Sequence, residues 1–162
     1  MSEIIKVGMA DLKVCISPNG VTTLGLGSCV GIALRDPTTK VGGLAHIMLP
    51  DSTQIRNSQY NVAKFADTGI EELVKQMERS GAKRRNLVAK IAGGATMFHI
   101  QGKSDAILVG KRNVEATKEK LKQMGIPILA EDTGLNYGRT VTFYPETGEF
   151  RIRAVGKTET VI

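Results

Sequence analysis

The stretch VTTLGLGSCVGIAL, residues 21–34, places two apolar runs on either side of a glycine-rich turn. The runs at 21–24 and 30–34 are typical of short β-strands, and the second is apolar throughout, as in a buried strand. Glycines let the chain between them turn tightly and leave amide N–H groups open to a bound oxygen. A side chain at this junction can emerge at the end of a sheet, and the residue there is Cys29.

The remaining pattern is mostly β, with two helices. Short apolar segments predict further strands at 12–16, 41–49, 87–92, 126–129, 140–144 and 150–155. Apolar residues at three- and four-residue spacing predict one helix from near Ser58 to Gly81, and a second from an Asn113 cap to Gly125. Because strands and helices do not alternate steadily, we expect an α+β fold with two main helices covering mixed or antiparallel sheets. The 162 residues show no linker and predict a single domain, residues 1–162.

The positive charge could serve nucleic acid, an anionic membrane surface or an acidic protein partner, and the composition weakens the nucleic-acid interpretation. Lys and Arg number 22 against 16 Asp and Glu, a formal net charge of +6. Trp is absent, and the three Tyr and four Phe do not alternate with basic residues, as single-stranded nucleic-acid sites require. The densest basic cluster, residues 83–85, follows a predicted helix end, where cations are favoured in any case.

Several classes of site are excluded by the motifs. The two cysteines form no CxxC and no His/Cys cluster, so no metal site is expected. The glycine run 25–31 has its third glycine one place late for a dinucleotide fingerprint and leads into a strand, and no Walker motif occurs. We therefore expect no cofactor. No signal peptide or apolar run of membrane-spanning length is found, which predicts a cytoplasmic chain with reduced thiols and no membrane insertion.

Cys29 is the candidate nucleophile and His46 its candidate base, because a neighbouring imidazole is the commonest means of forming a thiolate near neutral pH. Each of the two residues could instead have a purely structural role. A free cysteine is often a small buried hydrophobe, as we expect for Cys15, and His46 lies in an apolar strand. His99 is the alternative base, and spacing alone leaves the choice open.

A family resemblance extends over nearly the whole chain. Segments 23–29 (TLGLGSC), 45–51 (AHIMLPD), 89–98 (AKIAGGATMF), 110–116 (GKRNVEA) and 130–134 (AEDTG) resemble CheD, the chemoreceptor glutamine deamidases. Leu135 departs from the family pattern, which usually has a second glycine after Gly134.

The resemblance implies a three-layer α/β sandwich and a protein-glutamine deamidase without cofactor. It identifies Cys29 as nucleophile, His46 as base and Thr23 as the third polar member, and the amides around Gly27 and Ser28 are the natural oxyanion donors. The implied substrates are glutamines of methyl-accepting chemotaxis receptors, and the implied second partner is the CheC phosphatase. The competing hypothesis is a largely non-catalytic regulatory module that acts on such a phosphatase.

Overall fold

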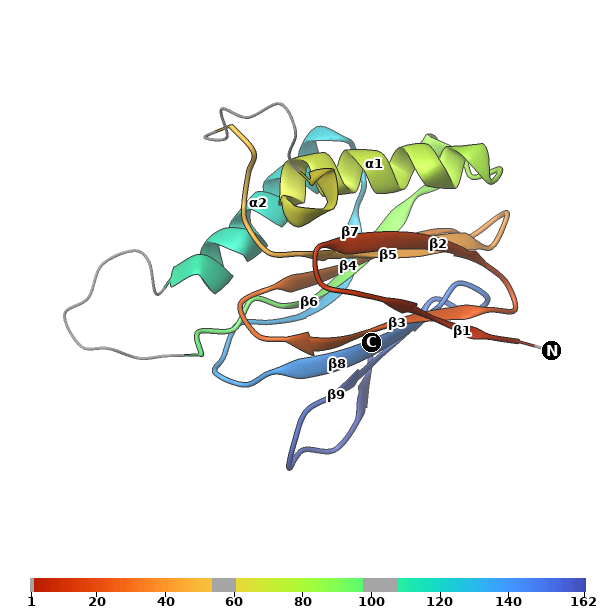
Figure 1. Cartoon of the computed structure of the whole chain (residues 1–162). Helices are drawn as coiled ribbons and strands as arrows, with labels where there is room; N and C mark the ends of the chain where they lie inside the picture. Colours follow the sequence, from red (N-terminus) through yellow and green to blue (C-terminus); the bar gives the residue numbers. More distant parts are fainter. Residues whose placement is uncertain (1, 54–60, 98–107) are drawn as a thin grey trace.

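The computed structural model describes residues 2–53, 61–97 and 108–162. Within these residues two five-stranded sheets pack against each other, and the helices cover one of them (Figure 1). The outer sheet has the order β1 (Ile4–Val7), β3 (Gly20–Leu26), β8 (Arg139–Tyr144), β9 (Glu149–Arg153), β10 (Thr160–Val161). The central sheet has the order β2 (Asp11–Ile16), β5 (Val41–Ile47), β4 (Val30–Asp36), β6 (Val88–Gly93), β7 (Ile128–Thr133).

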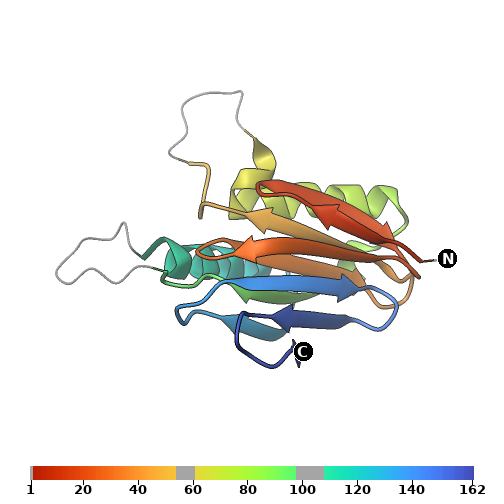
Figure 2. The ribbon, with the colours of Figure 1, turned by 60° about the horizontal axis from the view of Figure 1, so that its bottom comes forward.

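Both sheets are mixed. The pairs β1–β3 and β6–β7 are parallel, and the remaining neighbours are antiparallel. The helices α1 (Ala66–Arg79) and α2 (Val109–Gln123) lie on one side of the central sheet, and the outer sheet lies on its other side. Figure 2 shows the remaining face of the outer sheet, with no helix over it. The predicted α+β class and three-layer arrangement are confirmed.

Two apolar clusters separate these layers. One lies between the helices and the central sheet and includes Val30, Ile47 and Leu73. The other lies between the two sheets and includes Cys29, Leu44 and Phe143. Covered on both faces, the central strand β5 is buried at all seven positions, which explains its continuous apolar run.

Both helices end where the sequence predicts, but neither begins at the residue that the sequence predicts. Gly81 and Gly125 follow α1 and α2 with left-handed backbones, φ 105° and 71°, as glycine stops do. The expected start of the first helix near Ser58 lies outside the described residues, and α1 itself begins at Ala66, after a 3₁₀ turn, Val62–Lys64. Asn113 is not a cap, because α2 begins at Val109 and carries Asn113 inside it. The strands β1 and β10 were not predicted.

Candidate active site

The chain crosses from the outer sheet to the central sheet at Cys29. Strand β3 ends at Leu26 and β4 begins at Val30, so Gly27, Ser28 and Cys29 form the whole crossing. Just before it, the β3–β8 register shifts between Thr23 and Leu26, and Gly25 adopts φ 70°. Bulges of this kind bend a strand and re-aim its side chains. The predicted position of Cys29, where a turn meets a strand, is confirmed.

Cys29 and His46 lie on the same face of the central sheet. His46 on β5 pairs with Gly31 on β4, and the pair Val30–Ile47 follows. Since side chains alternate along a strand, Cys29 is on the same side as Gly31 and therefore as His46. Such diagonal neighbours lie about 7–8 Å apart on an ideal sheet, within reach of longer side chains. Both side chains face the outer sheet and are buried, His46 at 1% exposure and Cys29 at 8%.

Thr23 reaches His46 across the gap between the sheets. Its Oγ1 lies 2.7 Å from His46 Nδ1 and 2.8 Å from the carbonyl oxygen of Val7, to which it donates. The hydroxyl has one proton, and once that proton goes to Val7 the hydroxyl must accept from Nδ1–H. The tautomer assigned in this way leaves Nε2 unprotonated. Nε2 is buried and has no hydrogen-bond partner among the described residues, Cys29 included.

Burial shifts the pKa of Cys29 and the pKa of His46 in the directions that favour their neutral forms. It raises the pKa of the Cys29 thiol above its ordinary value, an effect partly offset by a hydrogen bond from the residue's own backbone N–H. Burial also lowers the pKa of His46 below its ordinary value. Both shifts favour a neutral thiol beside a neutral imidazole. Cys15 is free and buried, and burial raises its pKa to about 12, in keeping with the predicted inert thiol.

The three carbonyl oxygens of the crossing all accept hydrogen bonds from the loop after β6 or from α2. Gly27 O accepts from the Ala95 amide at 2.9 Å, and Cys29 O accepts from the Gly94 amide at 2.8 Å. Ser28 O accepts from the side chain of Asn113 at 2.8 Å. In the described chain, the amides of Gly27 and Ser28 donate no hydrogen bond outside the strand ladders.

Sequence reasoning missed two buried residues that support the site, Asn113 and Arg139. Arg139 has a fully buried side chain, and its Nε donates to Asp132 Oδ1 at 3.0 Å. Its Nη1 donates to Gly134 O at 3.0 Å, and its guanidinium lies over the ring of Tyr137, 4.5 Å from the centroid. The segments quoted for the resemblance contain Asn113 and Asp132, the partner of Arg139, and this is the sequence signal that could have pointed to both residues.

Leu135 adopts the left-handed conformation that favours glycine, with φ 60°. Its carbonyl oxygen accepts from the Thr96 amide at 2.9 Å, so the turn forms despite the side chain. The family's usual glycine would adopt this backbone without the roughly 1–2 kcal/mol that a Cβ costs there. The turn that the sequence put in doubt is thus kept, with local strain.

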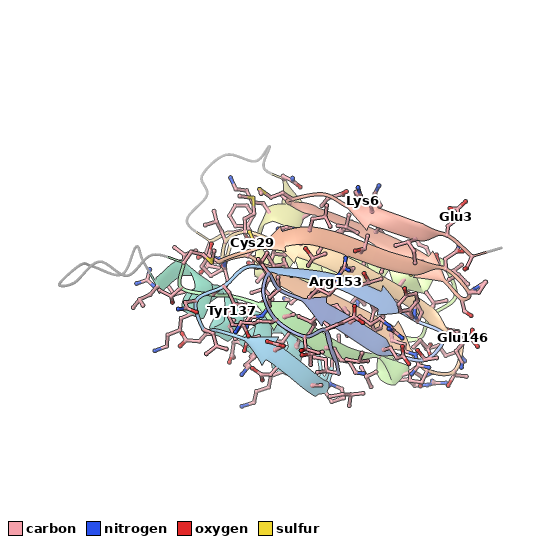
Figure 3. All side chains as sticks on the ribbon, turned by 90° about the horizontal axis from the view of Figure 1, so that it is seen from below. Glu3, Lys6, Cys29, Tyr137, Glu146 and Arg153 are labelled. Carbon is pink, nitrogen blue, oxygen red and sulfur yellow. The ribbon has the colours of Figure 1, made fainter. Side chains whose placement is uncertain are left out.

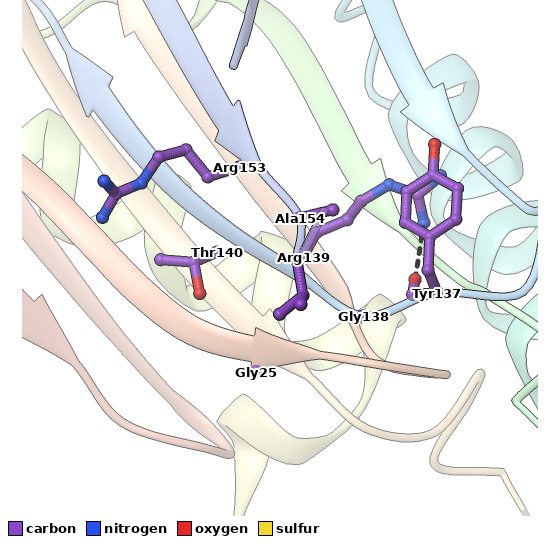
Figure 4. Close-up of a pocket in the computed structure, with 8 residues that line it drawn as sticks. Gly25, Tyr137, Gly138, Arg139, Thr140, Arg153 and Ala154 are labelled. Carbon is purple, nitrogen blue, oxygen red and sulfur yellow. Dashed lines mark hydrogen bonds between the residues drawn. The ribbon is translucent and has the colours of Figure 1, made fainter. Parts of the chain in front are cut away.

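A hollow of about 560 Å³ opens on the outer sheet beside this turn, lined by Gly25, 137–140 and 153–155. In Figure 4 the side chain of Arg153 extends to one side of the hollow and the ring of Tyr137 lies at the other. Figure 3 shows Cys29 and Tyr137 at one end of this face, Glu3 and Glu146 at the other, and Arg153 between. The hollow therefore extends from the end of this face that carries Cys29 toward its middle.

The basic cluster 83–85 lies far from Cys29. The Lys83 amide donates to Asp36 at the far end of β4, and Arg84 pairs with Glu78 at 3.2 Å. The seven residues of β4 separate Asp36 from the crossing by about 20 Å.

His99, the alternative base, lies outside the described residues. Of the helices in the described ranges, none has the length and apolar character to cross a membrane. No group of three His, Cys, Asp or Glu side chains there could hold a metal ion.

A thiol and an imidazole on one sheet face, with a hydroxyl fixing the tautomer, are the groups that cysteine-dependent acyl-transfer enzymes use. The family model for CheD, described as chemotactic sensory transduction, matches residues 48–154, a segment that begins after Cys29 and His46. The chain belongs to the CheD family.

Relatives extend this similarity to almost the full length. A Lachnoclostridium phytofermentans protein named "Probable chemoreceptor glutamine deamidase CheD" is 62% identical, with 98% of each chain covered. The "Chemoreceptor glutamine deamidase CheD" of Halalkalibacterium halodurans is 51% identical over 98% of each chain. A solved Neisseria meningitidis structure of family DUF152 shares the fold, with TM-score 0.51 and 8% identity, covering 82% of this chain and 64% of that one.

Proposed function

We propose that this chain is a chemoreceptor glutamine deamidase, a single domain over residues 1–162 that converts receptor glutamines to glutamate. The observation that supports it most is the Val7–Thr23–His46 hydrogen-bond chain, which leaves His46 Nε2 as the unprotonated nitrogen on the face that carries Cys29. The names of the relatives supply the substrate class.

In the proposed reaction, Cys29 Sγ attacks the Cδ carbon of the glutamine side chain while its proton passes to His46 Nε2. The amide π bond opens and its oxygen becomes an oxyanion, which the amides of Gly27 and Ser28 stabilise. One such donor contributes roughly 3 kcal/mol to the transition state. Because burial favours the neutral pair, proton transfer accompanies attack instead of preceding it.

The second half of the reaction uses the same imidazole. Nε2–H gives its proton to the departing nitrogen, ammonia leaves, and a thioester to Cys29 remains. Water then loses a proton to Nε2 and attacks the thioester carbon, the C–S bond breaks, and the thiol re-forms with glutamate as product. Thr23 orients the ring throughout. No step calls for a cofactor or metal.

We propose that the substrate is a methyl-accepting chemotaxis receptor and, because the target glutamines that the resemblance implies lie on its cytoplasmic helices, that the chain acts in the cytoplasm. We propose that the hollow beside Tyr137 and Arg153 receives a helix flanking the target glutamine. We also propose a CheC-type phosphatase as second partner, on the family resemblance. The alternative function, a mainly non-catalytic regulator of that phosphatase, requires binding without deamidation.

The decisive experiment is mass spectrometry of a purified receptor cytoplasmic fragment before and after incubation, because each Gln to Glu conversion adds about one mass unit. Cys29→Ala should leave less than about a thousandth of the wild-type rate, the residual typical of lost nucleophiles. Cys15→Ala is the matched control and should stay active, since that thiol is buried outside the proposed triad. A fully active Cys29→Ala variant would exclude the covalent mechanism. An inactive wild type that still bound the phosphatase would favour the non-catalytic alternative.

A further inference from the structure

The β4–β5 ladder opens just where the proposed catalytic residues lie. Its last pair is Val30–Ile47. Beyond that pair, the Met48 amide donates to Lys64 O at 2.8 Å, while Cys29 O accepts from the Gly94 amide on the β6 side. In the described part of the chain, no backbone hydrogen bond joins the crossing to the segment after His46. The two segments that carry nucleophile and base therefore separate here.

Asn113 spans this opening with its side chain. Its Nδ2 donates to Ser28 O at 2.8 Å and to Met48 O at 3.0 Å, and the residue is fully buried. Ser28 directly precedes Cys29, and Met48 is two residues after His46. Two protons on one nitrogen are needed to join two carbonyl groups, and an amide supplies them where a carboxylate cannot. The bridge takes the place of the missing backbone hydrogen bonds.

Close backbone packing holds α2 where Asn113 can make this bridge. A Cβ on Gly110 would lie 2.3 Å from Ala95 O, and one on Gly94 would lie 2.2 Å from Val114 Cγ2. Distances this short leave no room for a side chain at either glycine. The first turns of α2 thus rest directly on the loop whose amides hold Gly27 O and Cys29 O. The position of the helix and that of the crossing are coupled.

The remaining polar atom of Asn113, Oδ1, is buried without a partner among the described residues, as is the hydroxyl of Thr117. An unpaired buried polar atom destabilises a fold and does not by itself indicate a function. What distinguishes Asn113 is where its donated bonds end. Both bonds that Asn113 does donate end beside proposed catalytic residues.

We propose that Asn113 is a positioning residue that keeps the Cys29 thiol within reach of His46 Nε2. The inference rests on the proposed function for the roles of Cys29 and His46. Displacing reacting groups by about 1 Å can slow an enzyme about 100-fold. Loss of the bridge should therefore lower kcat and leave KM nearly unchanged, because Asn113 is buried beneath the site and does not face the receptor.

The test uses two substitutions and a matched control. Asn113→Asp keeps the volume and replaces the donor by a carboxylate facing two carbonyl oxygens, and Asn113→Ala removes the bridge without adding charge. Thr117→Val is the control, because Thr117 lies one turn along α2, is equally buried, and its hydroxyl has no partner in the described chain. Circular dichroism and melting establish folding, deamidation of a receptor fragment gives kcat and KM, and iodoacetamide gives the reactivity of Cys29 at pH 7.5.

We expect folded Asn113 variants whose kcat is about 100-fold lower and whose KM is within about twofold. Alkylation of Cys29 should slow about tenfold, and Thr117→Val should match wild type in both assays. If wild type itself does not deamidate, the proposed function fails, and the alkylation comparison still decides the role of Asn113. The inference is overturned if a folded Asn113 variant keeps wild-type kcat and alkylation, or if Thr117→Val is slowed as much. It is equally overturned if neither Asn113 variant folds while Thr117→Val does, since Asn113 would then be structural.

Discussion

Replacing Thr23 by valine should make His46 a weaker base in the proposed reaction. Valine has the shape of threonine, so no cavity forms, but the two hydrogen bonds of Oγ1, to Val7 O and from His46 Nδ1, are lost. With no acceptor left, an N–H at Nδ1 would be buried unpaired, which costs about 1–3 kcal/mol. A proton on Nε2 would be unpaired as well, so the preference for the tautomer with a free Nε2, the nitrogen that accepts from Cys29 in the proposed reaction, is lost.

The size of the effect follows from the hydrogen bond that selects the tautomer. A bond worth about 1–1.5 kcal/mol favours the tautomer with Nε2 unprotonated, and its loss lowers the ratio of that tautomer to the other about tenfold. Loss of ring orientation adds to this, so we expect kcat/KM to fall 10- to 100-fold, about 1.4–2.7 kcal/mol. His46→Ala removes the base entirely and should cost more, about 10²- to 10⁴-fold. Stability should fall as well, by about 2 kcal/mol, since both buried hydrogen bonds of the hydroxyl are lost.

Deamidation of a receptor fragment, followed by mass spectrometry, measures the rate, and ¹⁵N NMR of the imidazole reports the tautomer directly. Thr23→Ser keeps the hydroxyl and should stay within a few-fold of wild type. Thr22→Val is the matched control, because Thr22 Oγ1 donates to Val141 O at 2.7 Å and contacts no histidine. A Thr23→Val variant with wild-type rate, or a Thr23→Ser variant as slow as Thr23→Val, would refute the assigned hydrogen-bond chain.

Further expectations concern pH, charge and strain. Because burial lowers the pKa of His46, the neutral base persists below its ordinary value of about 6.5, so the acid limb of kcat/KM should have its midpoint below that pH; a midpoint above it contradicts the assignment. Arg153→Glu, beside the hollow, should lower kcat/KM on receptor fragments more than reversal of residues 83–85, and raising salt from about 0.05 to 0.5 M should shrink the difference. Equal effects would show that the hollow does not receive the receptor. Leu135→Gly should relieve left-handed strain in an exposed residue and raise Tm by about 1–3 °C, as measured by thermal melting; a lower Tm would mean that the leucine is not strained.

Much of the architecture was predictable because periodicity and stop signals are local. The apolar runs of β4, β5 and β6 and the glycine stops of both helices lie where the sequence predicts them. Strands β1 and β10 were missed because they are short and owe their form to partners distant in sequence. Ile4–Val7 pairs with β3, and Thr160–Val161 pairs with β9.

The candidate site was predictable in its residues but not in its geometry. The glycine-rich crossing and the resemblance indicated Thr23, Cys29 and His46, and spacing left open which histidine serves Cys29. The choice depends on the β4–β5 register, which no local pattern specifies. Asn113 was misassigned as a helix cap, since an asparagine before an apolar repeat has the same local signature whether it caps a helix or points into a core. Its two acceptors lie 85 and 65 residues away along the chain.

The hydrogen bond from His46 to Thr23 joins residues on different sheets. The geometry of the proposed site therefore depends on how closely the two sheets pack. Near the site the two layers are also joined by the three-residue crossing at Cys29, by apolar contacts and by the ion pair between Arg139 and Asp132. A fluctuation that parts the layers by a fraction of an ångström stretches that bond before any strand is lost. Heat inactivation should therefore begin below the temperature at which the circular dichroism changes, and it should reverse on cooling.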